Sequence, residues 1–200
     1  MVKQLNLFLL LVALFHTAGY AQNDQLVSKK YLLKTSLTIS PGFFLKIPVN
    51  LVYFHGHLEY FPEEKVSLRG DAFLGMNSPH SPHITANHCL QFGAFYHFSR
   101  GKFDPFLGFQ PGINFSQIKL SKVPAFQTGI TPMLSLSGGA NYFVSRYFHF
   151  FLSMGYYKGT LLKMVHPIWS SSLEQVPVKT PLDEIRISGG LGFNIHVKKQ

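Results

Sequence analysis

Hydrophobic and polar residues alternate along most of this chain with a period of two. The clearest case is segment 185–197, where Ile, Leu, Phe and Val occupy odd positions and Arg, Ser, Asn and His occupy even ones. Successive side chains of a β-strand point to opposite faces, so this spacing predicts a strand with one apolar and one polar face. The alternation continues well beyond the about 5–6 residues of a usual strand.

The same pattern predicts eight strands, with no helix and no linker between domains. The strands cover about 33–43, 49–61, 66–75, 88–98, 104–116, 132–144, 148–159 and 185–197. Short turns are expected at 62–65, 99–103 and 145–147, and long loops at 76–87, 117–131 and 160–183, with a modest first loop near 44–48. An even number of strands joined by alternating short turns and long loops is typical of an outer-membrane barrel.

The polar face indicates which side of the strands meets lipid. It carries mainly Gly, Ser, Thr, Asn and Gln, whereas a sheet surface in water carries many Lys and Glu. Small side chains suit an eight-stranded barrel, whose interior is just wide enough for side chains to fill. We therefore expect an all-β, eight-stranded antiparallel up-and-down transmembrane β-barrel with its apolar side chains outward. A soluble periplasmic lipocalin-like barrel, with an apolar interior that binds an apolar ligand, is the alternative.

A barrel in lipid cannot leave a strand edge unpaired. We therefore expect the eighth strand to pair with the first and close the wall. Pro41 and Pro111 lie in predicted strands although proline donates no ladder hydrogen bond, and we place both near the loop ends.

Composition supports a membrane wall. Charged residues make up 14% of the 200 residues and aromatic residues 15%, whereas about 25% charge is usual in soluble domains. The net charge of +9 would suit nucleic acid, but the longest basic clusters are pairs such as 29–30 and 198–199, so no nucleic-acid partner is expected. Cys89 is the single cysteine, which excludes a disulfide within the chain.

The first residues have the features of an export signal. Lys3 precedes the apolar run Leu7–Phe15, and Gly19 and Ala21 are the small residues of a cleavage site. The apolar run is shorter than the ~20 residues that a membrane-spanning helix needs. We expect 1–21 to be a signal peptide and 22–200 to form one outer-membrane β-barrel domain.

With these features the chain resembles the small eight-stranded outer-membrane β-barrel families, the OmpX/OmpA-type barrels. The resemblance rests on the signal, the eight alternating strands and the Gly-rich segments PFLGFQPGINF (105–115) and SGGLGFNIHV (188–197). It implies a monomer in the cell outer membrane with a structural or surface-interaction role. Its partners would be outer-membrane lipid and lipopolysaccharide, and a surface or secretion-apparatus protein is compatible with it.

Four charged residues of both signs occupy the predicted inner face: Glu59, Arg69, Asp71 and Arg186. We expect them to pair across the lumen and plug it, which is a structural role. A narrow ion path through the barrel is the alternative. At the loop end, Lys119, Lys122, Lys163 and Lys179 are candidates to contact the phosphates of lipopolysaccharide.

Five histidines share the polar face: His55, His57, His97, His149 and His196. Hydrogen bonding inside the lumen explains all of them. His55 and His57 could instead present two imidazoles to a metal ion, but no Cys or carboxylate in the sequence evidently completes such a site. We therefore expect no metal and no cofactor.

A lipid A-modifying barrel enzyme is a further alternative. His97 and Ser99 lie on the same strand face, and hydrolysis or acyl transfer by such a pair would require a carboxylate that orients the imidazole. The sequence shows no such acid. We therefore expect a protein that is not an enzyme.

Overall fold

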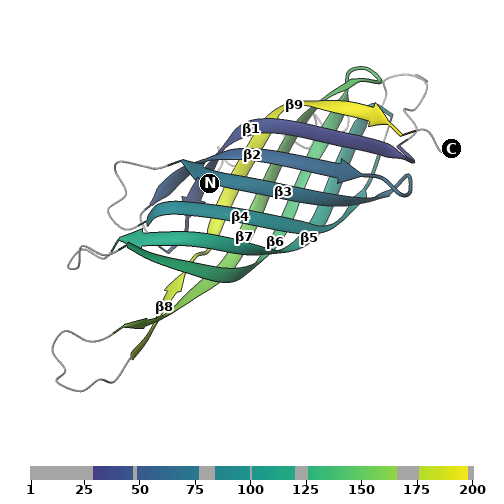
Figure 1. Cartoon of the computed structure of the whole chain (residues 1–200). Coiled ribbons are helices and arrows are strands. Elements are labelled where there is room, and N and C mark those ends of the chain that lie inside the picture. The colour runs from purple at the N-terminus through teal and green to yellow at the C-terminus, as the bar shows by residue number, and fades with distance from the viewer. Residues whose placement is uncertain are drawn as a thin grey trace, which may run out of the picture.

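The computed structural model describes residues 29–46, 49–76, 84–99, 101–119, 126–165 and 176–197, so the predicted signal peptide lies outside it. The strands form a closed antiparallel barrel (Figure 1). They are β1 (Leu32–Phe44), β2 (Asn50–Tyr60), β3 (Val66–Met76), β4 (Ile84–His97), β5 (Phe103–Lys119), β6 (Phe126–Phe143), β7 (Phe148–Val165), β8 (Val176–Pro181) and β9 (Glu184–His196). Among the described residues, no helix has the length and apolarity needed to span a bilayer.

Eight of these strands form the wall. Each of β1 to β7 pairs with the next along the chain, and β9 pairs with both β7 and β1. The predicted closure is therefore confirmed, because Leu33 of the first strand lies opposite Ile195 of the last.

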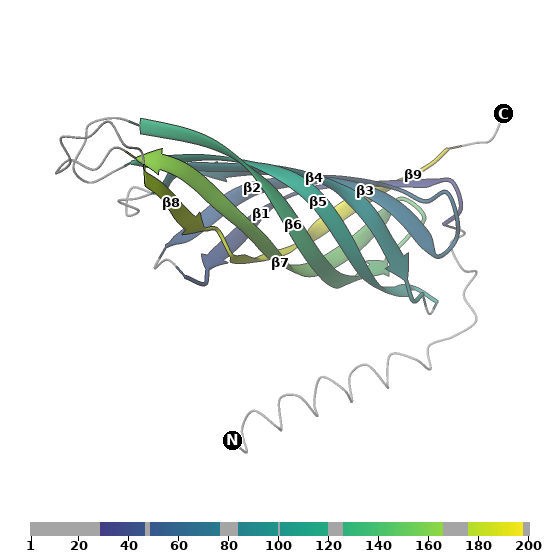
Figure 2. The same ribbon diagram turned by 90° about the horizontal axis from the view of Figure 1, so that it is seen from below.

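The predicted loop 160–183 contains structure that the sequence interpretation missed. There β7 continues to Val165 and pairs with β8, so the two strands form a hairpin beyond the wall. Figure 2 shows this hairpin at the end of the barrel opposite the one where β9 ends. Val176, Val178 and Thr180 are β-branched residues, which favour extended backbone, and they account for the additional strand.

The apolar side chains face outward. Leu134, Leu191 and Phe193 are 46%, 43% and 51% exposed, while Arg186 and Asn194 are buried inside the barrel. This orientation confirms the transmembrane prediction. The lipocalin-like alternative is wrong, because it requires an apolar interior.

Proline interrupts the ladder between β1 and β9. Pairing ends where Ser36 lies opposite Gly192 and resumes where Gly42 lies opposite Arg186. Pro41 lies at the end of this interval and still pairs with β2. Because proline lacks an N–H, the interruption falls on one side of β1 only.

Side-chain hydrogen bonds bridge the interrupted part of this seam. Thr38 Oγ1 donates to the carbonyl oxygen of Gly189 at 2.7 Å, and the hydroxyls of Ser40 and Ser188 lie 2.5 Å apart. These contacts hold the first and last strands together where the backbone ladder is absent. They matter because closure joins the two ends of the chain.

Pro111 does not lie near a loop end, contrary to the sequence interpretation. It lies in the middle of β5, opposite Leu134 in an uninterrupted β5–β6 ladder. The β4–β5 ladder on its other side is interrupted between Gln91 and Ala94. A strand can therefore carry a proline inside the wall when only one of its two ladders loses a bond.

The orientation of the wall generates a stability prediction. Leu152 is 63% exposed on β7, so Leu152→Arg should lower the free energy of unfolding in bilayers by about 2–4 kcal/mol. Leu152→Ala should have a much smaller effect, since it opens no cavity in a protein core. Urea titration in lipid vesicles, read by the gel mobility of the unheated protein, measures both. Equal stability of the arginine variant and the wild type would contradict the orientation.

Candidate functional site: the polar lumen

Charged side chains from the strands and from the segment before β1 converge inside the barrel. Their positions follow from strand parity, which directs every second side chain of each strand inward. The buried members that form ion pairs there are Lys29, Lys34, Glu59, Arg69, Asp71, Asp104, Glu184 and Arg186. They form three groups along the barrel, and each group contains both signs of charge.

The first group lies at the turn end and centres on Glu59. Lys34 Nζ lies 2.8 Å from Glu59 Oε2, at ion-pair distance but without the alignment of a hydrogen bond. The same ammonium lies 4.7 Å from the centre of the Phe61 ring. Glu59 Oε1 accepts a hydrogen bond from the Ser67 hydroxyl at 2.5 Å and lies 3.0 Å from His97 Nε2.

Asp104 extends this turn-end group across the barrel. His97 Nδ1 lies 2.9 Å from Asp104 Oδ2, and Lys29 Nζ and the Ser99 hydroxyl each donate to Asp104 Oδ1 at 2.6 Å. Lys29 precedes β1, so the segment before the first strand contributes its side chain to the lumen. Burial lowers the pKa of Lys29, and the Asp104 carboxylate opposes that shift.

The second group lies deeper in the lumen. Arg69 donates from Nε and Nη2 to the Asp71 carboxylate, at distances of 2.7 to 3.1 Å. His55 Nε2 lies 2.7 Å from Asp71 Oδ1, and Gln110 Nε2 donates to Asp71 Oδ2 at 2.6 Å. Both carboxylate oxygens are therefore fully engaged. The Arg69 guanidinium also lies 5.2 Å from the centre of the Phe95 ring.

The third group lies toward the loop end. Arg186 donates from Nε and Nη2 to Glu184 Oε2 at 3.0 and 2.8 Å. Its guanidinium carbon lies 4.2 to 4.6 Å from the ring centres of Tyr53, Phe73 and Tyr157. Three aromatic rings and one carboxylate thus surround a single buried cation.

The four charges predicted from the sequence all lie inside the barrel but do not form one cluster. Arg69 and Asp71 pair directly, whereas Glu59 pairs with Lys34 and with His97. Arg186 pairs with Glu184, which is two residues away on the same strand, rather than with a side chain across the lumen.

Sequence reasoning missed four of the partners: Lys29, Lys34, Asp104 and Glu184. Lys29 precedes the first strand. The other three lie on the inward parity of their strands, so the signal was present in the alternation. Lys34 and Asp104 stand at the start of predicted strands, and Glu184 stands one residue before one. Predicted strand ends shift by a residue or two, which is why the signal is weakest there.

Four of the five predicted lumen histidines lie inside. His55, His57, His97 and His149 are buried. His57 Nδ1 lies 2.6 Å from the Ser36 hydroxyl, and His149 Nδ1 lies 2.7 Å from Asn194 Oδ1.

The prediction that His196 lies inside the lumen is wrong, because this residue is exposed. It is the last residue of β9 and lies opposite Leu32, the first residue of β1. Parity directs it inward, but at the rim of the barrel no wall encloses it.

The structure supplies the carboxylate that the metal hypothesis lacked. Donor atoms of His55, His57 and Asp71 lie within 4.8 Å of one another. However, the Asp71 carboxylate already accepts hydrogen bonds from Arg69 and Gln110. A metal cation there would have to displace or adjoin the Arg69 guanidinium, so electrostatics favours the ion pair.

An acid also orients His97, contrary to the expectation from the sequence. Asp104 binds one imidazole nitrogen, and the hydroxyl near the other is Ser67 at 2.9 Å rather than Ser99. This is the hydrogen-bond order of a Ser–His–Asp triad. Ser67 and His97 are completely buried, however, and the Glu59 carboxylate lies against both. A carboxylate at that position opposes the negative charge that acyl transfer would develop.

No family model and no curated protein matches the sequence. Solved structures do match. OprG from Pseudomonas aeruginosa is 9% identical, with 86% of this chain and 100% of that chain covered and a TM-score of 0.59. The N-terminal β-barrel domain of OprF from the same organism is 13% identical, with 83% and 98% covered and a TM-score of 0.55.

A third match is Ail, the attachment invasion locus protein of Yersinia pestis. It is 11% identical, with 83% of this chain and 99% of that chain covered and a TM-score of 0.51. Ail has also been solved in complex with the heparin analogue sucrose octasulfate. These likenesses establish the fold.

The chain is therefore a small eight-stranded barrel of the outer-membrane type. Its exposed apolar wall requires a bilayer, and a closed antiparallel barrel of this kind is built to span the outer membrane.

The central ion pair generates a second stability prediction. Arg69→Ala leaves the buried Asp71 carboxylate without its cation and should lower the free energy of unfolding in detergent by about 3–5 kcal/mol. Arg146→Ala, at an exposed turn, is the matched control and should leave the unfolding midpoint unchanged. A midpoint for Arg69→Ala that equals the wild type would refute the pairing.

Proposed function

We propose that this protein is a closed, non-conducting outer-membrane barrel with a structural or surface-interaction role at its loop end. The observation that carries the proposal is the series of three charge-balanced groups along the lumen. A series of buried ion pairs leaves no continuous polar path for solutes, because each group would have to open. We assign these groups a structural role rather than a catalytic one.

The loop end offers the surface through which such a barrel can act. Pairing of β6 with β7 stops where Met133 lies opposite Gly159. Beyond that level β5 and β6 continue to Lys119 opposite Phe126, and β7 and β8 continue to Val165 opposite Val176. Two hairpins thus extend past the last level at which the wall is complete.

Lysines on these hairpins support lipopolysaccharide as the partner. Lys163 and Lys179 lie on adjacent strands of the β7–β8 hairpin, in neighbouring cross-strand pairs, and Lys119 ends β5. Lys122 lies outside the described residues. Lysines on such hairpins would form charge-assisted hydrogen bonds with phosphates of lipopolysaccharide. The complex of the similarly folded Ail with a sulfated sugar is consistent with an anionic partner for barrels of this fold.

Closure of the lumen is tested by conductance. Wild-type protein in planar bilayers should give no steady current, and Arg186→Ala should also give none, since two further groups remain in series. Incorporation is checked by the different gel mobilities of heated and unheated protein. Steady wild-type current whose ion selectivity changes in Glu184→Gln would instead establish the ion path.

The lipopolysaccharide partner is tested by charge reversal. Binding of the wild type to immobilised lipopolysaccharide should weaken as salt is added, and changing Lys119, Lys122, Lys163 and Lys179 together to Glu should abolish it. The matched control reverses Lys30 and Arg146, which are at the turn end, and should bind as the wild type does. Undiminished binding by the four-residue variant would exclude these lysines as the contact.

A further inference from the structure

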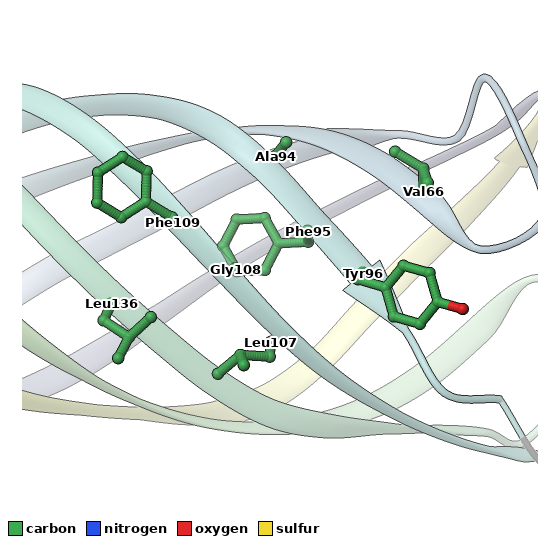
Figure 3. Close-up of a pocket in the computed structure, with 8 residues that line it drawn as sticks. All are labelled: Val66, Ala94, Phe95, Tyr96, Leu107, Gly108, Phe109 and Leu136. Atoms are coloured by element: carbon green, nitrogen blue, oxygen red, sulfur yellow. The ribbon is translucent and has the colours of Figure 1, made fainter.

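The outer wall carries a hollow over β3, β4, β5 and β6. Its volume is about 330 Å³, and its lining includes Val66, Ala94, Tyr96, Leu107, Phe109 and Leu136 (Figure 3). The side chains of these six residues are apolar except for the hydroxyl of Tyr96. The hollow thus lies within the surface that meets lipid and offers hydrocarbon on its sides.

A single small residue, Ala94, creates the hollow. Leu68, Ala94, Phe109 and Leu136 form one row across the four strands, and Ala94 is the only small side chain in it.

The floor of the hollow is closed from the inside. The ring of Phe95 packs against Gly108 from the lumen so closely that a Cβ at Gly108 would overlap it. Phe95 itself is buried and lies beside the Arg69 guanidinium. The hollow is therefore a groove on the outside of the wall rather than an opening into the lumen.

The groove lies near the turn end of the barrel. Val66 is the first residue of β3, and Tyr96 is the last but one of β4. In Figure 3 Tyr96 lies at the arrowhead of β4, with its hydroxyl directed away from Phe109 and Leu136. Short turns of such barrels face the periplasm, so the groove belongs to the periplasmic leaflet. Tyrosine with an apolar ring and a polar tip suits the level of the headgroups.

A cation stands at the headgroup end. Lys65 immediately precedes Val66 and is exposed, and no carboxylate among the described residues pairs with it. The neighbouring acids are engaged elsewhere, since Glu63 pairs with Lys30 and Glu64 accepts from the Lys29 amide. An anionic phosphate at this level would therefore find a free positive charge.

We propose that this groove binds one acyl chain of an anionic glycerophospholipid of the periplasmic leaflet, with Lys65 near its phosphate. The inference rests on the placement of the wall in the membrane and does not depend on closure of the lumen. A groove lined by hydrocarbon loses dispersion contacts unless a flexible chain fills it. A lipid held on several sides exchanges more slowly than its neighbours on the convex wall.

The test is lipid retention by the full barrel in native mass spectrometry after reconstitution with phosphatidylglycerol and phosphatidylcholine. Wild type should retain one phosphatidylglycerol under conditions that strip other lipids. Ala94→Phe excludes about two methylene groups from the groove and should weaken retention by about tenfold. Ala72→Phe, the same change on the outward face of β3 away from the groove, is the matched control and should retain lipid normally.

Lys65→Ala tests the headgroup separately, and it should retain either lipid without preference. Retention by Ala94→Phe equal to wild type would overturn the proposal, as would equal retention of the two lipids by the wild type or a retained second copy of the chain in place of lipid. None of these outcomes depends on whether the lumen conducts ions, because conductance tests only the proposed closure of the lumen.

A fluorescence measurement keeps the test independent of the folding of Ala94→Phe. Trp169, the only tryptophan, is replaced by Phe, and Tyr96→Trp introduces an indole at the groove. Phosphatidylglycerol with brominated acyl chains should quench this indole more strongly than brominated phosphatidylcholine at equal mole fraction. An indole introduced by Leu152→Trp should be quenched equally by both. If the two brominated lipids quench the indole at position 96 equally, as they should at position 152, the proposal is overturned.

Discussion

Hydrocarbon offers no hydrogen-bond partner to a peptide group, and this constraint organises the whole molecule. Each strand must find both neighbours, so the last strand has to meet the first. The β1–β9 seam satisfies this requirement even where Pro41 falls in the ladder, because Thr38 and Ser40 contribute side-chain hydrogen bonds. In a soluble sheet, water could bind the peptide groups at such an interruption. In this wall, side chains of the protein have to provide the hydrogen bonds instead.

The same constraint determines what the lumen contains. With apolar side chains committed to lipid, the interior receives polar ones, and an eight-stranded barrel is too narrow to solvate them freely. Charges are therefore balanced locally, as in the Arg69–Asp71 pair and the Arg186–Glu184 pair. Aromatic rings such as those of Tyr53 and Phe95 cover the guanidinium groups, which further limits the space for water or solute.

Close packing of polar groups also produces arrangements that resemble reactive sites. His97 has a hydroxyl on one side and a carboxylate on the other, and His55 lies near a second imidazole and Asp71. In each case an additional charge, from Glu59 or Arg69, opposes the chemistry that the arrangement suggests. Function is better sought on the outside of the molecule, at the extended hairpins and on the lipid-facing wall.

Alternation along the sequence by itself determined the eight strands of the wall, the closed barrel and the face that meets lipid, because parity is a local property of extended backbone. It also assigned Glu59, Arg69, Asp71 and Arg186 to the interior. Only the tertiary structure decided their partners, since register and curvature set which strands bring their side chains together. The tertiary structure also decided that His196 is exposed, because the wall ends before it encloses this residue. It likewise decided the β7–β8 hairpin, because the hairpin depends on pairing between strands.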